Sequence, residues 1–198
     1  MKNLFALIAL IFSISITAQE FKDGKFVKVI QAEGKSVKEI RASVREWVSV
    51  SYGSAESVID LDSESKMIVK GQINLPQTSG NAKFKTTLTI SYKESRFKVD
   101  LKLNSFFNIG TNTWDSSIIK QYEYILSKTR TKEEYFQLVM KGYEDAKMIR
   151  MGEKRLKKKG DLMYADYLKS RKDSYGKIVD IFDSIETKVN SESVEEDW

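Results

Sequence analysis

The sequence of 198 residues contains neither cysteine nor histidine. Their absence excludes disulfides, Cys/His metal sites, thiol nucleophiles and imidazole acid–base catalysis at once. The sequence also has no apolar run as long as the roughly 20 residues that a membrane-spanning helix needs. We therefore expect a fold held by its hydrophobic core alone, and we expect no cofactor, no metal ion and no catalytic residue.

The longest apolar run lies at the N-terminus and predicts export. Lys2 supplies a positive charge, residues 4–16 form a nearly unbroken apolar stretch of about 13 residues, and Ala18 gives a small residue before Gln19. This order is typical of a cleaved signal peptide covering residues 1–18. We expect a periplasmic or extracellular protein without a transmembrane segment after cleavage. An uncleaved N-terminal anchor helix is the alternative.

The composition of the remaining chain is that of a folding protein. Hydrophobic residues make up 41% and charged residues 31%, with a net charge of +5. These values exclude wholesale disorder, a collagen-like chain and a polytopic membrane protein. About 180 residues remain for folding, which is enough for one compact domain and a satellite.

The first part of the mature chain alternates in the manner of an α+β domain. A strand is expected at residues 26–30, and Ser36 with Glu39 has the spacing of a capping box that opens a helix ending near Gly53. The helix carries one apolar stripe, formed by Val37, Ile40, Val44, Trp47 and Val48. Four further strands are expected at residues 58–62, 67–75, 84–92 and 97–103, with a loop at 76–81. This stripe is expected to cover the apolar face of an antiparallel sheet.

The second part of the chain has helical periodicity. Asp115 is expected to cap a helix that carries apolar residues from Ile118 to Leu126 and lies beside the first helix. Thr131 and Glu134 repeat the capping-box spacing at the start of a long charged helix, and Gly160 is expected to end that helix. A second helix with a heptad-like seam would complete a C-terminal hairpin. The seam and its continuation comprise Leu168, Tyr175, Ile178, Phe182, Ile185 and Val189.

These patterns divide the chain into four parts. We expect a signal peptide at residues 1–18, an α+β domain at 19–127, a helical hairpin at 128–190 and a flexible acidic tail at 191–198. The narrow seam of the hairpin would suit either an antiparallel pair within one chain or contact with another chain, as in a homo-oligomer.

Several short segments resemble a known family. They are Gly34-Lys35-Ser36, Trp47, the run from Ser54 to Ile59, Val69-Lys70-Gly71, Thr87-Leu88-Thr89-Ile90 and Arg96-Phe97-Lys98. Together they resemble a bacterial exported domain-of-unknown-function family with a TBP-like fold, over residues 26–107. The resemblance implies one β-α-β-β-β-β-α unit and no known activity. TBP itself uses two such units on DNA, so nucleic-acid binding is not expected of this chain.

Two groups of charged residues are candidates for chemistry. Asp60, Asp62 and Glu64 alternate and would offer oxygen ligands to calcium or a carboxylate pair to a hydrolase, although a solvated strand end explains them as well. The second group is basic and occupies the polar positions of the last two strands, where it would form an anion-facing surface or a solvated lysine-rich face that blocks edge pairing. Its members are Lys83, Lys85, Arg96, Lys98 and Lys102.

The sequence therefore favours an exported binding or protein-interaction module of the cell envelope, without enzymatic activity. Its partner would be an envelope protein or an anionic envelope component. A structural or oligomer-forming envelope protein is one alternative, and a carboxylate-dependent hydrolase is another.

Overall fold

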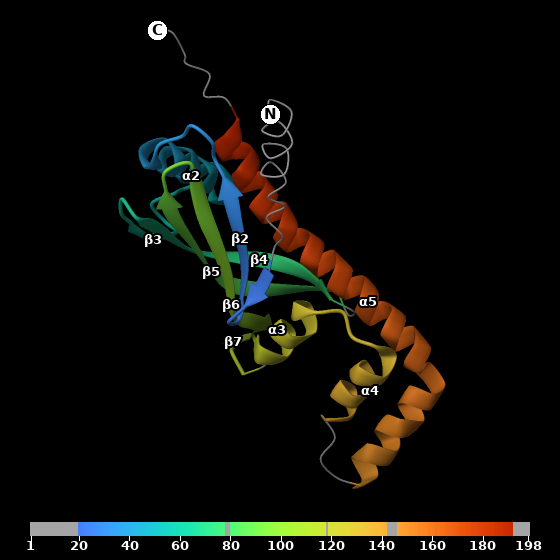
Figure 1. The fold of residues 1–198 in the computed structure, drawn as a ribbon. Coiled ribbons are helices and arrows are strands. Elements are labelled where there is room, and N and C mark those ends of the chain that lie inside the picture. The colour runs from blue at the N-terminus through green and yellow to red at the C-terminus, as the bar shows by residue number, and fades with distance from the viewer. Residues whose placement is uncertain (1–19, 78–79, 118, 142–145, 192–198) are drawn as a thin grey trace, which may run out of the picture.

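A computed structural model describes residues 20–77, 80–117, 119–141 and 146–191 (Figure 1). The described strands are β1 (Glu20–Lys22), β2 (Lys25–Gln31), β3 (Ile59–Asp62), β4 (Lys66–Gln77), β5 (Gly80–Lys93), β6 (Arg96–Asn108) and β7 (Thr113–Asp115). The helices are α2 (Val37–Tyr52), α3 (Ile119–Ser127), α4 (Lys132–Met140) and α5 (Ala146–Asn190).

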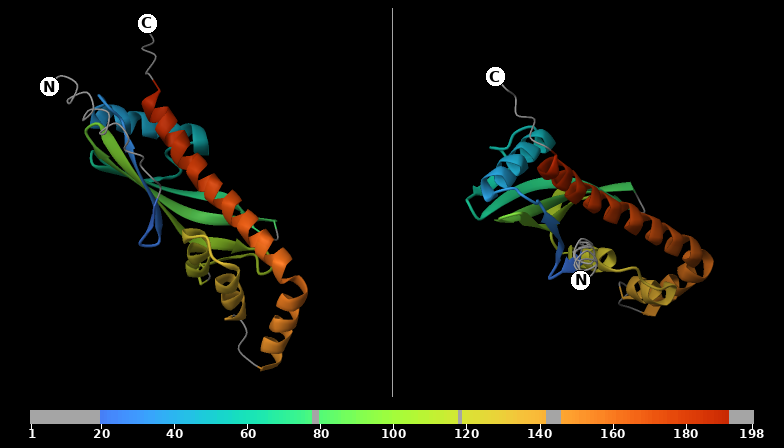
Figure 2. Two further views of the ribbon diagram at one scale, coloured as in Figure 1. Left: turned by 45° about the vertical axis from the view of Figure 1, so that its right-hand side comes forward. Right: turned by 45° about the horizontal axis from the view of Figure 1, so that its top comes forward.

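One antiparallel sheet organises the molecule. Its strands follow the order β1-β2-β6-β5-β4-β3, and β7 pairs with β6. Helices α2 and α5 lie side by side on one face of this sheet (Figure 2). The expected α+β class with an antiparallel sheet covered on one face is confirmed, and the unit β-α-β-β-β-β-α is present as β2-α2-β3-β4-β5-β6-α3.

Helix α2 begins and ends where the sequence predicts. The Ser36 side chain accepts a hydrogen bond from the Glu39 backbone N–H, and the Glu39 carboxylate accepts from the Ser36 backbone N–H. Gly53 ends the helix with φ of 76°, a left-handed conformation that glycine adopts without strain. Trp47 is only 8% exposed, which confirms that the apolar stripe faces inward.

The C-terminal part of α5 belongs to the core of the sheet. Ile178, Phe182, Ile185 and Val189 are fully buried in the same cluster as the inward side chains of the strands. Trp47 Nε1 donates a hydrogen bond of 3.0 Å to Ser184 Oγ of α5. The boundary expected after residue 127 therefore does not separate two cores, and this stretch of the heptad-like seam is used inside the chain.

The expected turn at Gly160 is wrong. Helix α5 runs unbroken through Gly160, and the hairpin instead turns between α4 and α5. A Cβ on residue 160 would lie 2.6 Å from the ring of Phe136 in α4, so the glycine allows two helices to approach closely. The capping box at Thr131 is confirmed, but the helix it opens ends at Met140. A glycine needed for close packing and one needed for a helix end look alike in sequence.

Three smaller expectations are also corrected. Residues 76–81 are not simply a loop, because Pro76 pairs with Asn81 at the end of the β4–β5 ladder. Asp115 is the last residue of β7 rather than a helix cap, although its carboxylate accepts from the Ser117 backbone N–H. Helix α3 packs on β6 and α5, so the helix beside α2 is α5.

The expected signal peptide and all but the first residue of the expected acidic tail lie outside the described residues. Ile118, expected in the helix capped by Asp115, also falls outside them. In the part of the chain that the structure describes, no helix combines the length and the apolar character needed to cross a membrane.

Candidate anion-binding surface

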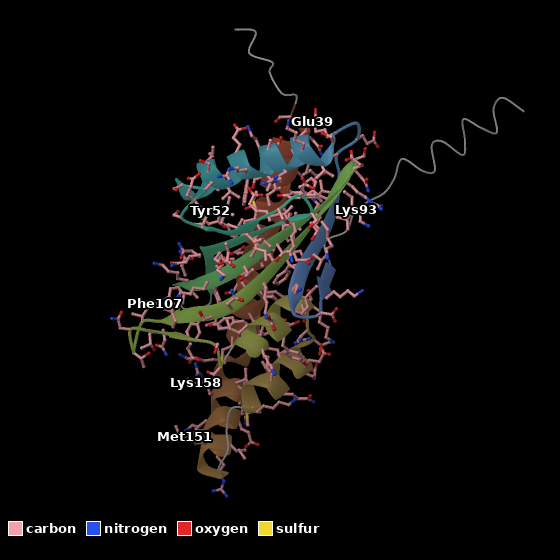
Figure 3. All side chains as sticks on the ribbon, turned by 90° about the vertical axis from the view of Figure 1, so that its left-hand side faces the viewer. Glu39, Tyr52, Lys93, Phe107, Met151 and Lys158 are labelled. Carbon is pink, nitrogen blue, oxygen red and sulfur yellow. The ribbon has the colours of Figure 1, made fainter. Side chains whose placement is uncertain are left out.

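The face of the sheet opposite α2 and α5 carries the basic residues expected from the sequence. Figure 3 views the sheet from this side, with α5 passing behind it. We call this surface the open face and define it by the outward positions of β4, β5 and β6. Residues Lys83, Lys85, Arg96, Lys98 and Lys102 are all exposed. Strand register places all five on this face, because inward neighbours such as Phe84 and Val99 are buried in the core.

At two places on the open face, the strand register puts one lysine on each side of a hydroxyl residue of β5. Lys66 of β4 and Lys98 of β6 both lie opposite Ser91 of β5. Lys70 of β4 and Lys102 of β6 flank Thr87 of β5 in the same way. Strands are about 4.8 Å apart, so the two lysines of a row have Cα atoms about 10 Å apart. The rows lie four residues apart along β5, about 13 Å.

One lysine in each row has an acidic partner and the other has none among the described residues. Lys98 Nζ lies 3.0 Å from Asp100 Oδ2, and Lys70 Nζ lies 2.9 Å from Asp60 Oδ1. Lys66 and Lys102 form no ion pair within the described ranges. The open face therefore keeps an excess of uncompensated positive charge at two diagonal positions.

Asp100 is the acidic exception on this face. It lies between the two rows, opposite Val27 of β2 and Thr89 of β5, and is only 8% exposed. Its Oδ2 contacts Lys98, while its Oδ1 has no hydrogen-bond partner among the residues that the structure describes. A buried carboxylate oxygen without a partner is costly, so Asp100 is a specific feature of the face rather than a solvated charge.

The end of the open face near β7 is formed by a β-bulge and aromatic residues. Asn104 is the extra residue of β6 at this bulge, and its Nδ2 donates to Thr87 Oγ1 at 2.8 Å. Beyond the bulge the parity of β6 reverses, which brings Phe107 onto the open face beside Trp114 of β7. Lys85 Nζ lies 4.5 Å from the centroid of the Trp114 ring, a cation–π contact.

Glu123 of α3 lies near Lys102 of the open face. Burial raises the pKa of the Glu123 carboxyl, and the nearby charge of Lys102 acts in the opposite direction. Lys102 therefore has a negative charge in its neighbourhood without a direct ion pair. At the opposite end, the last residues of β5 and the first residues of β6 line a cleft of about 430 Å³ together with Val29 of β2.

The three acids that suggested calcium or a hydrolase do not converge. Asp60 lies at a β-bulge in β3, which turns it toward Lys70 on the open face, while Asp62 points to the covered face. Asp62 accepts hydrogen bonds of 2.7 Å and 2.8 Å from Arg41 and Arg45 of α2. Within the described residues, no group of three or more Asp or Glu side chains is placed to hold a metal ion. Regular alternation in the sequence could not reveal the bulge that separates these acids.

Sequence reasoning missed Lys66, Lys70 and Asn104 as parts of this surface. The two lysines lie on β4, and only the β4–β5 register shows that they complete the rows. The alternation of this strand breaks directly after Asn104, where the polar Ser105 takes an apolar position, and that irregularity was the available signal for a bulge.

Comparison with known proteins gives structural neighbours only. No family model and no curated protein matches the sequence. A TBP-like protein from Parabacteroides distasonis is 16% identical and aligns with a TM-score of 0.47 over 86% of this chain and 96% of its own. A DUF4468 family protein from Bacteroides ovatus is 14% identical, with a TM-score of 0.50 over 90% of this chain and 94% of its own. The DUF4468 neighbour agrees with the resemblance to a bacterial domain-of-unknown-function family and shows, at this level of identity, a shared fold and nothing further.

Proposed function

We propose that this protein is a binding module whose open face recognises an anionic component of the cell envelope. One observation carries the proposal: helices cover one face of the sheet, while the other presents basic residues from three adjacent strands in register. A lysine that only protects a sheet edge belongs on an edge strand. Here β5 and β6 are interior strands, so edge protection does not explain their lysines.

The spacing of the rows suits an extended ligand with several negative groups. Two rows about 13 Å apart offer four ammonium groups, with the hydroxyls of Ser91 and Thr87 between them. Lysine binds phosphate or carboxylate as a point charge, and a hydroxyl can donate to the same oxygen atoms. A ligand bearing repeated phosphate or carboxylate groups would engage both rows at once.

A binding role is favoured over catalysis by the character of this surface. Catalysis needs a concave site in which polar groups of perturbed pKa converge, whereas the basic residues of the open face are spread along three strands. Burial raises the pKa of both Tyr92 and Tyr52, and neither side chain is on the open face. The N-terminal run of the sequence supports a place for this module in the envelope.

The experiment compares two anionic probes. Binding of the purified protein is measured by co-sedimentation with vesicles containing phosphatidylglycerol and by calorimetry with soluble polyphosphate. The double substitution Lys66→Gln and Lys102→Gln removes the two lysines that have no ion pair. At about 1 kcal/mol for each lysine near an anionic surface, we expect affinity to fall about 30-fold.

The matched control removes two exposed lysines from α5, by Lys154→Gln and Lys172→Gln. This change in net charge is identical, and the open face stays intact. An equal loss of affinity in both double variants would mean that net charge alone attracts the probe and would refute the proposed surface. Vesicle binding without polyphosphate binding would identify a lipid headgroup, and the reverse would identify a free polyanion.

A further inference from the structure

A stretch of β4 is an unpaired edge of the sheet. Strand β3 contains only four residues, and its pairing with β4 ends where Ile59 lies opposite Val69. Beyond this point β4 continues to Gln77 and, in the described part of the chain, has strand β5 as its partner on one side only. The chain enters β3 from a turn in which Ala55 O accepts the N–H groups of Val58 and Ile59.

Two contacts show which backbone groups point out of this edge. The Lys70 N–H donates to Val58 O beside β3, and Pro76 O accepts from the Ser174 hydroxyl of α5. Both residues are therefore oriented away from β5. Backbone groups alternate in direction along a strand, and the β4–β5 register has no shift between these positions. The N–H and C=O groups of Gln72 and Asn74 consequently also point outward.

A cleft of about 590 Å³ lies along this edge. Its lining includes Val58 at one end and Lys70, Gly71 and Gln72 along the strand, and it extends over Lys85 and Thr86 of β5 to Asn104 of β6. Tyr52, at the C-terminus of α2, forms the wall on the covered side (Figure 3). A Cβ on Gly71 would lie 2.5 Å from the Tyr52 ring, so the ring rests directly on the strand backbone.

The wall formed by Tyr52 is held from behind. Its ring makes an edge-to-face contact with Trp47, with centroids 6.1 Å apart. Trp47 in turn donates a hydrogen bond to Ser184 of α5. At the far end, the contact between Ser174 and Pro76 closes the edge. The free segment between Lys70 and Leu75 thus has a fixed wall and two defined ends.

We propose that this edge binds an acidic peptide in extended conformation by adding it to the sheet as a strand. Such strand addition uses main-chain hydrogen bonds for affinity, which Gln72 and Asn74 can provide. The lining of the cleft carries two lysines, Lys70 and Lys85, and no carboxylate, which favours glutamate or aspartate side chains on the peptide. The pair between Lys70 and Asp60 is exposed on both sides, so exchange for a peptide carboxylate costs little.

This inference does not rest on the proposed function: Lys70 and Lys85 belong to both surfaces, but strand addition depends on the outward backbone groups of Gln72 and Asn74, which the proposed function does not use. Residues 70 to 75 contain neither proline nor a bulge in their pairing with β5, and Lys70 is the only charged residue among them. The neighbouring strand β3 does have a bulge and two aspartates. The outward backbone groups of β4 between Lys70 and Leu75 therefore remain available for pairing, which is consistent with use as a binding site.

The probe is a blocked seven-residue peptide of alternating valine and glutamate, and the comparison probe has lysine in place of glutamate. Backbone amide signals of the isotope-labelled protein are followed by NMR during titration. We expect a Kd below about 1 mM for the acidic peptide. We also expect hydrogen exchange to slow at the Gln72 and Asn74 amides, and weaker binding of the lysine peptide.

The decisive variant is Gln72→Pro, which removes one outward N–H from a position where proline is compatible with a sheet edge. It should reduce affinity at least tenfold, whereas the matched control Gln72→Ala retains the N–H and should bind as the parent does. If the proline variant fails to fold, Lys70→Glu provides the test and should reverse the preference between the two peptides.

Three outcomes would overturn the inference. The first is absence of binding by either peptide at millimolar concentration. The second is a response confined to amides of the open face, such as those of Ser91 and Lys98. The third is protection of the Gln72 and Asn74 amides without peptide, together with a doubled mass in sedimentation, because a second copy of the chain would then occupy the edge.

Discussion

Truncation of Phe182 to alanine tests whether α5 is part of the core of the sheet. The Phe182 side chain has no exposed surface and belongs to the same cluster as Ile30, Trp47 and Leu101. Phe182→Ala removes the buried ring and leaves a cavity between α5 and the sheet. Changes of this type cost about 3–5 kcal/mol. Since domains of this kind are stable by about 5–15 kcal/mol, the loss is a large share of the total.

The assay is urea unfolding followed by two signals, far-UV circular dichroism and tryptophan fluorescence. For a chain of this size, 1 kcal/mol corresponds to about 2–4 °C in Tm, so the variant should also melt about 6–20 °C lower. Leu162→Ala is the matched control, because Leu162 lies in the same helix but is 61% exposed. Its effect should stay within about 0.5 kcal/mol.

Independence of α5 from the sheet would give a different result. The helical signal of Phe182→Ala would then be lost at low urea, while the fluorescence transition kept the midpoint of the parent protein. Two separated transitions, or a loss of less than about 1 kcal/mol, would refute the assignment of α5 to the core of the sheet.

Three further predictions concern single contacts. Gly160→Val should destabilise by about 1–3 kcal/mol in thermal unfolding, because its side chain would collide with Phe136; Gly176→Ala, in open space on the same helix, should be neutral or stabilising. Burial raises the pKa of Asp62, but hydrogen bonds from two α2 arginines outweigh it and lower that pKa below 3.8, so Asp62→Asn should destabilise at pH 7 by about 1–3 kcal/mol. This difference should vanish in acid titrations as pH falls through the lowered pKa, and a constant difference down to pH 2 would contradict the role of the charge. Burial lowers the pKa of Lys28, but hydrogen bonds and charges from two α5 carboxylates outweigh it and raise that pKa above 10.5, so the stability that Lys28→Met removes should be fully present below pH 10 and lost at higher pH.

The individual helix ends and strand faces follow from local sequence patterns. The capping boxes at Ser36 and Thr131 and the glycine at position 53 specify helix ends through hydrogen bonds and φ preferences that involve neighbours in the chain. The alternation from Phe84 to Leu103 fixes which side of each strand is apolar. Because strand side chains alternate between faces, this alternation also placed the five expected basic residues on the open face.

How these elements pack together depends on contacts between residues that are far apart in the sequence. A glycine such as Gly160 can end a helix or allow a second helix to approach closely, and the packed neighbour decides between the two. Here that neighbour is Phe136, from a segment more than twenty residues away. The partners of Lys28 and Trp47 lie on α5, at sequence distances that no local pattern spans. The rows on the open face and the free edge of β4 depend on register and on where β3 stops, and both are set by packing of the whole sheet.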